Sequence, residues 1–501
     1  MAKIKDFYWN FKTKFPRINL IFWVVLWSFL VITFFSTSTS FIYPLTNVDS
    51  INLDSNFFLY EGYALVSGKI PYIEFYDHKG LYHVLINAFG VVLGGRYGVF
   101  LLQIIYLAFT LYFLYLTVKL WSDNPYHPIL AIFIYSLFLF CLLGGNAEGE
   151  WLMPFITLPL YFYTKGIKTN SDKAFLIGSF FLGLEMGLAL NSRPTDAMWG
   201  AAIAIYYIVY WARHKKDLNL LFNVLIAIAG LLIPFIIILP WAIHVGFLKE
   251  MFSAIYLGNA SYVLSSTFDL ERLINQIGII IVFTLILLSY LKFKKKENVE
   301  YDLLEMYFVV FCVTLFCYLL IAKYTHYYFS ALSFLSSYIV FLLSKTKLSL
   351  KWTKRLNFIP VTAISIIALV FVSGYYSFGV TNFSYRDSLS IKKAVEELPL
   401  DKLNDEDFFA VNCDPAVYLI AGVESSFPYF ANQSWWGKSN PKVIEETNNY
   451  LKEECPFYLL VGKLEATMVD FGETINELYS PIETIDNPHF TIYTMKTIPA
   501  L

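Results

Sequence analysis

The ionisable residues that could do chemistry gather in a few segments that separate long apolar runs. The first segment, about 39–97, carries Asp49, Asp54, Glu61, Glu74, Asp77, His78 and Lys79. Later segments carry Glu148 and Glu150, then Arg193 and Asp196, then Lys323 and His326. Carboxylates can take the proton from an attacking hydroxyl group, and Arg, Lys and His can stabilise a leaving group such as a phosphate. Because ionisable groups are costly near a membrane, we interpret this set of residues as a candidate functional site.

Membrane-spanning helices must position these residues, because the composition excludes a soluble protein. Of the 501 residues, 57% are hydrophobic, 19% aromatic and only 15% charged, so a bilayer must be the solvent. About eleven apolar runs are long enough to cross it as helices. They centre on 19–38, 98–120, 128–143, 150–164, 174–191, 197–212, 219–244, 273–291, 304–322, 327–343 and 357–378. The net charge of -2 excludes a basic field that would attract nucleic acid.

The distribution of Lys and Arg predicts how the chain is oriented in a cell membrane. With a cytoplasmic amino terminus, the short cytoplasmic segments hold 20 Lys and Arg residues, and the opposite segments before the carboxyl-terminal tail hold seven. Because positive residues favour the cytoplasmic side, the amino terminus is expected in the cytoplasm and the tail outside it. The ionisable set then also faces outward, whereas a transporter would place such residues near the midplane.

The character of the chain changes near residue 380, where polar residues and Pro return. Segments 408–412, 457–462 and 489–496 have the length and composition of strands, and Pro441–Glu454 that of a helix. The sequence therefore predicts a membrane part over 1–380 and a small extracytoplasmic α/β domain over 381–501. Two cysteines near the predicted strands, Cys413 and Cys455, leave a disulfide open as an alternative.

The first outer segment, 39–97, is expected to contain two helices of its own. Phe57, Phe58, Ala64 and Leu65 recur at helical spacing, and a second apolar helix is predicted from about Leu81 to Val92. Their length suits helices that lie in the membrane interface. Asp54 would lie at the amino-terminal end of the first helix, and the DHKG run (77–80) just before the second.

Four motifs carry a resemblance to a known family. The run DSNFFLYEGYALVSGKIPYIEFYDHKG (54–80) resembles the first outer loop of bacterial glycosyltransferase family 39-like membrane proteins, relatives of protein O-mannosyltransferases and lipid A aminoarabinose transferases. GGNAEGEW (144–151), NSRPTDAMW (191–199) and KYTHYYF (323–329) follow in the order of that family's later outer motifs. The resemblance covers roughly 19–343. This sequence departs from the family pattern at Leu81, Gly149 and Thr195, where Pro, an acid and Asn are usual.

The resemblance implies the C-type glycosyltransferase fold, and it assigns roles to matched residues. Asp54 would be the catalytic carboxylate, Glu150 the acid of the second outer loop, and Arg193 and His326 would lie near the phosphate of a lipid-linked donor. Asp77 is expected as a further catalytic residue, and Lys79 and Lys323 as further donor phosphate-binding residues.

The expected function is therefore transfer of a sugar from a polyprenyl phosphate-linked donor to a glycan, lipid or protein acceptor. Direct displacement would invert the anomeric centre. Membrane lipids are expected partners, nucleic acid is not, and neither a metal nor another cofactor is expected, although several carboxylates could hold a divalent ion. Two alternatives stay open, a lipid-linked sugar transporter or flippase and a non-catalytic glycan-binding subunit. Asp54 and Glu150 could also serve only their helix ends.

Overall fold

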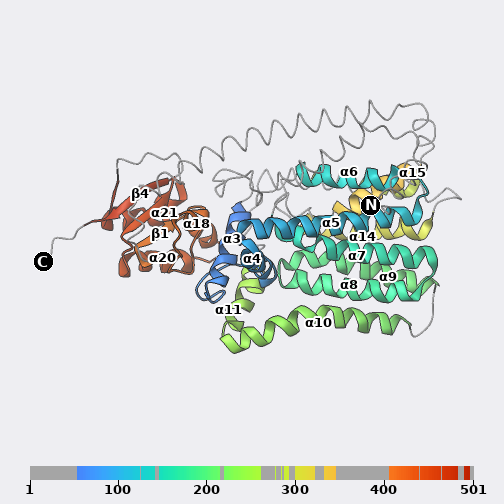
Figure 1. Cartoon of the computed structure of the whole chain (residues 1–501), viewed down its shortest axis with the longest axis horizontal. Coiled ribbons are helices and arrows are strands. Elements are labelled where there is room, and N and C mark those ends of the chain that lie inside the picture. Colours follow the sequence, from blue (N-terminus) through green and yellow to red (C-terminus); the bar gives the residue numbers. More distant parts are fainter. Residues whose placement is uncertain are drawn as a thin grey trace, which may run out of the picture.

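The computed structural model describes residues 53–124, 126–141, 146–214, 219–260, 300–321, 332–345, 405–438, 440–463, 465–482 and 490–496, with isolated positions at 277, 284 and 287–292. A bundle of long helices lies beside a smaller α/β domain, and two helices of the first outer segment lie between them (Figure 1). This junction brings together most of the described residues that the sequence predicts to be functional.

The long helices of the bundle coincide with predicted apolar runs. They are α5 (Arg96–Trp121), α6 (Tyr126–Cys141), α7 (Glu148–Thr169), α8 (Asp172–Leu190), α9 (Met198–His214), α10 (Asn219–Val245), α14 (Tyr301–Ile321) and α15 (Leu332–Lys345). Among the described residues, Arg96–Trp121, Asp172–Leu190 and Leu220–Val245 are long and apolar enough to cross a membrane. The predicted runs 19–38 and 357–378 and most of the run 273–291 lie outside the described residues, so the expected number of about eleven spans stays a prediction.

Aromatic and aliphatic side chains fill the interior of the bundle, and apolar side chains also cover much of its outside. Trp151 and Trp199 are 1% exposed and Tyr206 is fully buried, whereas Ile236 and Ile237 on α10 are 67% and 65% exposed. Since lipid tails solvate aliphatic side chains, such an outer surface suits helices that face a bilayer. Shorter elements extend the bundle at the site: the 3-10 helix η1 (Pro194–Ala197), α11 (Leu248–Phe252) and the π-helix η2 (Ser253–Gly258).

The two helices predicted in the first outer segment are present but differ in their surroundings. They are α3 (Leu53–Val66) and α4 (Leu81–Gly94). In α3 every residue from Ser55 to Ala64 is buried except Tyr63, so this helix does not have the single apolar face expected of an interfacial helix. By contrast, α4 leaves Val92 69% exposed near its end. Only α4 thus keeps the exposed apolar surface that interfacial binding needs.

The α/β domain contains a four-stranded sheet in the order β1-β2-β4-β3. Its strands are β1 (Phe408–Val411), β2 (Tyr458–Gly462), β3 (Tyr479–Pro481) and β4 (Phe490–Met495). The first pair is parallel, with Phe408 opposite Tyr458, and the other two pairs are antiparallel. The domain's helices are α18 (Ala416–Ala421), α19 (Gln433–Gly437), α20 (Lys442–Glu453) and α21 (Glu465–Leu478). The predicted strands and the predicted helix are all found.

Alternation along the strands gives the sheet two apolar faces. Phe409 and Val411 pack in one cluster with helices α20 and α21, while Phe408 and Ala410 belong to a second cluster that continues into α3. In that second cluster the ring centroids of Phe57 and Phe430 lie 4.7 Å apart. The sheet therefore supports the first outer segment directly.

Hydrogen bonds also join the α/β domain to the first outer segment. The Asn56 side chain donates to Asp414 Oδ2 at 3.2 Å, and the backbone N–H of Ser425 donates to the Tyr60 hydroxyl at 2.9 Å. Burial raises the pKa of Asp414 to about 7. Within the domain, Cys413 and Cys455 are unpaired thiols, so the disulfide considered from the sequence does not form.

Candidate functional site

The DHKG turn (77–80) is fixed against the bundle through its glycine. The Gly80 N–H donates to the Ser192 carbonyl at 2.6 Å, and the Tyr82 N–H donates to the Asn191 carbonyl at 2.7 Å. A Cβ on Gly80 would overlap the backbone carbonyl of Asn191, so this close approach requires glycine. Two motifs that are more than a hundred residues apart in the sequence, DHKG and NSRPTDAMW, therefore meet at their backbones.

The buried side chains of Glu61, Asp77 and His83 form an ionisable cluster under this turn. His83 Nε2 lies 3.2 Å from Glu61 Oε2 and 3.5 Å from Asp77 Oδ2. Burial raises the pKa of Glu61, and the nearby Asp77 raises it further. Burial opposes ionisation of Asp77, but Lys79 and His78 outweigh it and hold its pKa well below the usual range. Of the two carboxyl groups, Glu61 and Asp77, Asp77 is thus the ionised one.

His83 is the cation of this cluster. Burial alone would lower the pKa of the imidazole, but the hydrogen bonds to Asp77 and Glu61 raise it to about 9. The ligand atoms of the three residues lie within 4.8 Å of one another, close enough to hold a metal ion. A metal ion there would require the imidazole to lose its proton, because only the neutral ring is a ligand. In its protonated form the imidazole balances the charge of Asp77.

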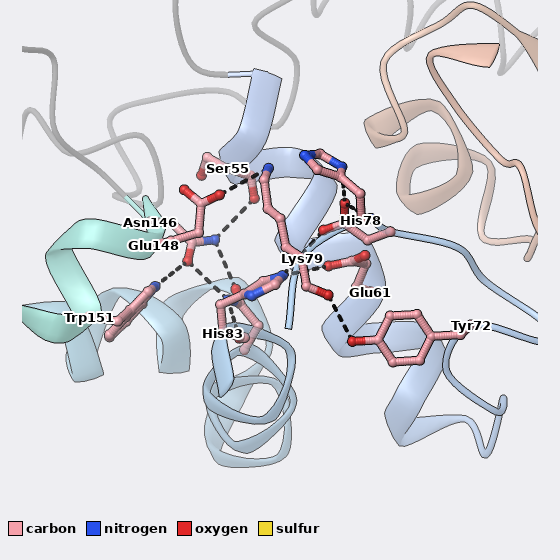
Figure 2. Close-up of polar contacts among 11 residues, drawn as sticks. Ser55, Glu61, Tyr72, His78, Lys79, His83, Asn146, Glu148 and Trp151 are labelled. Atoms are coloured by element: carbon pink, nitrogen blue, oxygen red, sulfur yellow. Dashed lines mark hydrogen bonds and ion pairs between the residues drawn. The ribbon is translucent and has the colours of Figure 1, made fainter. Parts of the chain in front are cut away.

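Lys79 reaches from the turn to the second outer motif, as Figure 2 shows. Its Nζ lies 3.0 Å from Glu148 Oε1 and 4.4 Å from the centre of the Phe58 ring. The Tyr72 hydroxyl donates to the Lys79 carbonyl at 2.8 Å. Both the backbone and the ammonium group of Lys79 therefore have defined positions next to α3 and α7.

A network of amides near Lys79 connects α3, α4 and the start of α7 (Figure 2). Asn146 and Asn87 exchange hydrogen bonds through their side chains at 2.8 and 3.0 Å. The indole N–H of Trp151 donates to Asn146 Oδ1 at 3.0 Å, and Asn146 Nδ2 donates to the Ser55 carbonyl at 3.0 Å. Buried amides with satisfied partners fix one geometry, so this network sets the start of α3 relative to α7.

Asp54 lies in the first turn of α3, as the sequence predicts, and its side chain is outside the described residues. The two residues that follow Asp54 contact different parts of the molecule. The Ser55 carbonyl accepts a hydrogen bond from Asn146 of the bundle, and the Asn56 side chain donates to Asp414 of the α/β domain. The backbone that carries Asp54 is thus clamped from both sides. Lys323 and His326 also lie outside the described residues.

Arg193 lies at the carboxyl-terminal side of α8 and is paired with a neighbour. Its Nε and Nη2 donate to the two oxygens of Asp196 at 3.0 and 2.9 Å. The Ser192 carbonyl accepts the hydrogen bond from Gly80, and Arg193 directly follows Ser192. The Arg193–Asp196 pair therefore lies next to the DHKG turn. One edge of the guanidinium fork is occupied by Asp196, and the role of Arg193 at a donor phosphate stays a prediction.

Glu150 supports its own helix. Its Oε2 accepts the Ala147 N–H at 3.3 Å and lies 3.5 Å from Gln103 Nε2. This is the contact of an N3 glutamate with the start of a helix. Glu150 and Gln103 also line a small, otherwise mostly apolar cavity between α5, α6 and α7, with Tyr106 and Tyr135. A catalytic role for Glu150 stays a prediction.

The sequence predicts no individual role for three residues of the site, Glu61, His83 and Glu148. It indicates Glu61 and Glu148 only as members of the outward ionisable set. His83 lies three residues beyond the matched motif, on the helix that directly follows the motif. The sequence does not reveal that these charged groups are buried, because the partners of Lys79 and His83 come from other elements of the fold.

The fold defines a class of membrane protein. Two solved structures share the fold: ArnT from Cupriavidus metallidurans bound to undecaprenyl phosphate, with a TM-score of 0.59 and 10% identity over 96% of this chain and 99% of that one, and the same protein in the apo state, with a TM-score of 0.60 and 9% identity over 94% and 97%. At these identities the likeness shows the fold alone. The chain is a membrane protein with the fold of C-type glycosyltransferases.

The particular family follows from the sequence match. Residues 11–391 match the family described as "Putative competence-induced protein Ccs4 N-terminal domain", and the chain belongs to this family. No curated protein matches the chain. The predicted resemblance is supported at the level of the fold shared with ArnT, whereas membership of glycosyltransferase family 39 is not confirmed, because the matching family is a different one.

Proposed function

We propose that the protein is a membrane glycosyltransferase that transfers a sugar from a polyprenyl phosphate-linked donor to an acceptor outside the cytoplasm. The observation that carries the proposal is the DHKG turn, which places Lys79 between α3 and α7 in a fold shared with ArnT, a protein that was crystallised bound to undecaprenyl phosphate. A partly dehydrated ammonium group beside an apolar bundle suits the phosphate of a lipid carrier.

In the proposed reaction, Asp54 is the general base. The acceptor hydroxyl oxygen attacks the anomeric carbon and forms the glycosidic bond while its proton passes to the Asp54 carboxylate. The bond between the anomeric carbon and the phosphate oxygen breaks, and its electron pair leaves with the polyprenyl phosphate. A single displacement inverts the anomeric centre. The clamped backbone on both sides of Asp54 supports this assignment, because a base must be held in place.

Positive groups would stabilise the leaving phosphate. Lys79 and Arg193 are the described candidates, and the bond from Gly80 to Ser192 keeps their segments together. Lys323 and His326 of the later motif are proposed to join them. Each charge-assisted contact to the phosphate would contribute about 1.5–3 kcal/mol.

Two predicted catalytic residues receive supporting roles in this proposal. Asp77 has a lowered pKa and is bound to His78 and His83, which makes it a weak base that orients the turn. Glu150 accepts from the start of α7 and would hold the second outer motif. Metal chemistry is not required by this scheme.

The proposed topology follows from charge. The bias of 20 to seven in Lys and Arg supports a multi-pass protein of a bacterial cell membrane with the site and the α/β domain outside the cytoplasm. The division into 1–380 and 381–501 is part of the same proposal. In Figure 1 the first outer segment lies at one end of the bundle, and an ionisable cluster at one end favours an enzyme over a flippase, which needs access from both faces.

The test uses purified full-length protein in lipid with polyprenyl phosphate-linked hexoses as donors. Release of polyprenyl phosphate is measured for the wild type and for Asp54→Asn, with cell-envelope extract as acceptor source. Asparagine keeps the shape of the side chain but cannot take a proton, so we expect a loss of about 10²–10⁴ in rate.

The matched control is Asp49→Asn, which lies outside the matched motif and should keep most activity. A folded Asp54→Asn protein with the wild-type rate would remove Asp54 as the base. A wild-type protein that translocates donor between leaflets without releasing polyprenyl phosphate would reject the transferase in favour of the flippase.

A further inference from the structure

The α/β domain brings an aromatic side chain to the DHKG turn. The short helix α19 presents Trp435, whose ring centroid lies 5.3 Å from that of His78 with an angle of 55° between the planes. His78 directly follows Asp77 and accepts a hydrogen bond on its carbonyl from Asn259 at 2.6 Å. A residue more than 350 positions away in sequence is therefore part of the wall around the predicted site.

The position of Trp435 is fixed by buried polar contacts beneath it. The Asn412 N–H donates to Gln433 Oε1 at 2.6 Å, and Asn412 Nδ2 donates to Ser434 Oγ at 2.7 Å. Asn412 directly follows strand β1 and has a φ of 51°, a left-handed conformation that asparagine tolerates. Gln433 also donates to the Ala410 carbonyl at 3.0 Å. The sheet thus anchors the helix that carries Trp435.

Two adjacent tryptophans of α19 have different environments. Trp436 is 3% exposed and packs edge-on against Phe57 and Tyr76, so it has a structural role between the domain and α3. Trp435 is only partly buried. An indole ring that is held rigidly and left partly open beside ionisable groups has the properties of a binding surface.

The two sides of the DHKG turn face different parts of the molecule. Gly80 and the His78 carbonyl contact Ser192 and Asn259 on the side of the bundle, whereas the His78 ring contacts Trp435 of the α/β domain. A polyprenyl carrier must approach from the bundle, because its chain stays in the membrane. The side lined by His78 and Trp435 is therefore left for the acceptor.

We infer that Trp435 positions a saccharide acceptor by stacking on one of its pyranose rings, next to His78. The inference rests on the proposed function and specifies the acceptor as a glycan. The C–H hydrogens on one face of a pyranose carry partial positive charge and are attracted to the negative face of an indole ring. Trp435 then sets where the acceptor hydroxyl lies, while transfer of the proton belongs to another residue.

The experiment measures binding of methyl pyranosides of glucose, galactose, N-acetylglucosamine and rhamnose to full-length protein in lipid nanodiscs by saturation-transfer NMR. We expect at least one of them to bind the wild type, Trp435→Ala to weaken that binding about tenfold, and Trp435→Phe to stay within about threefold, since a phenyl ring keeps a stacking face. Phe457→Ala is the matched control. Phe457 is an aromatic residue of the same domain, is 43% exposed and directly precedes strand β2.

Binding that is absent in the wild type, or unchanged in Trp435→Ala, would overturn the inference. Hydrolysis of the lipid-linked donor, in which water replaces the saccharide as acceptor, is measured in the same samples. This measurement separates the inference from the proposed function. We expect Trp435→Ala to hydrolyse donor at the wild-type rate but to need more saccharide acceptor for transfer. If the wild type never turns over donor while pyranoside binding depends on Trp435, the stacking role stands and the transferase function is rejected.

Discussion

Lys79 has an acidic partner and an aromatic partner, and both lie close to its ammonium group. The ammonium lies 3.0 Å from Glu148 and 4.4 Å from the Phe58 ring centre. Lys79→Met removes the charge, and we expect donor use, measured as kcat/KM, to fall by about 10–150-fold, which corresponds to about 1.5–3 kcal/mol. Lys249→Met, at an exposed lysine in α11, should retain the wild-type value.

A second variant separates charge from folding in this test. Lys79→Met leaves Glu148 buried without its lysine, which costs stability. Lys79→Met combined with Glu148→Gln restores neutrality and should recover melting temperature without recovering donor use. Full recovery of activity in the double variant would mean that Lys79 acts only on Glu148 and not on the donor.

His83 gives the molecule a predictable dependence on pH. Its pKa in the folded protein is raised to about 9 from the model-compound value of about 6.5. Between these values the folded state holds a proton that the unfolded state has lost, so the stabilisation is complete below about pH 6.5 and disappears as pH rises past 9. The raised pKa of Glu61 acts in the same direction. The contribution of His83 is at most about 3 kcal/mol.

The measurement is the apparent melting temperature of the purified protein from pH 6.5 to 9.5. We expect it to fall across this range in the wild type and to be lower and flatter in His83→Gln, which cannot become a cation. Identical slopes for the two proteins would show that His83 is not the titrating group.

At the scale of elements, the contact between the DHKG turn and the end of α8 decides how the outer segment meets the bundle. A methyl group at Gly80 would overlap the Asn191 backbone, so Gly80→Ala should cost about 1–3 kcal/mol and lower activity by displacing Lys79. Gly94→Ala is the control, because a Cβ at this exposed position in α4 meets nothing within 4 Å. Equal melting temperatures and activities in both variants would contradict this view of the contact.

Several elements could be predicted from local patterns, whereas their contacts could not. The first outer segment has helical spacing that predicts both α3 and α4, and the composition beyond residue 380 predicts the strands. The burial of most of α3 is not evident from the sequence, because Phe57 and Tyr60 are covered by Phe430 and Tyr418 of the distant domain. Likewise, Asp77 and Lys79 stand in a recognisable motif, but their partners His83 and Glu148 emerge only when α4 and α7 are placed.

At the scale of the whole molecule, the orientation in the membrane is open to direct test. The charge bias predicts that the α/β domain is outside the cell. Val469 on α21 is 78% exposed, and Lys173 at the start of α8 is exposed on the predicted cytoplasmic side. In a Cys455→Ser background, Val469→Cys should react with an impermeant thiol reagent in intact cells, and Lys173→Cys should react only after permeabilisation. The reverse pattern would place the site in the cytoplasm.

The clamp on α3 has a consequence for synthesis of the protein. Asn56 bonds to Asp414, a residue 358 positions later. Because a chain is made from its amino terminus, the helix that carries Asp54 leaves the ribosome long before the strand and loop that complete its surroundings. Nascent chains, and chains truncated before the sheet, would hold every assigned charge of the membrane part and still lack a rigid site. If the proposed function holds, the protein would therefore stay inert throughout its own insertion and begin to act on lipid-linked sugar only once its last segment has folded.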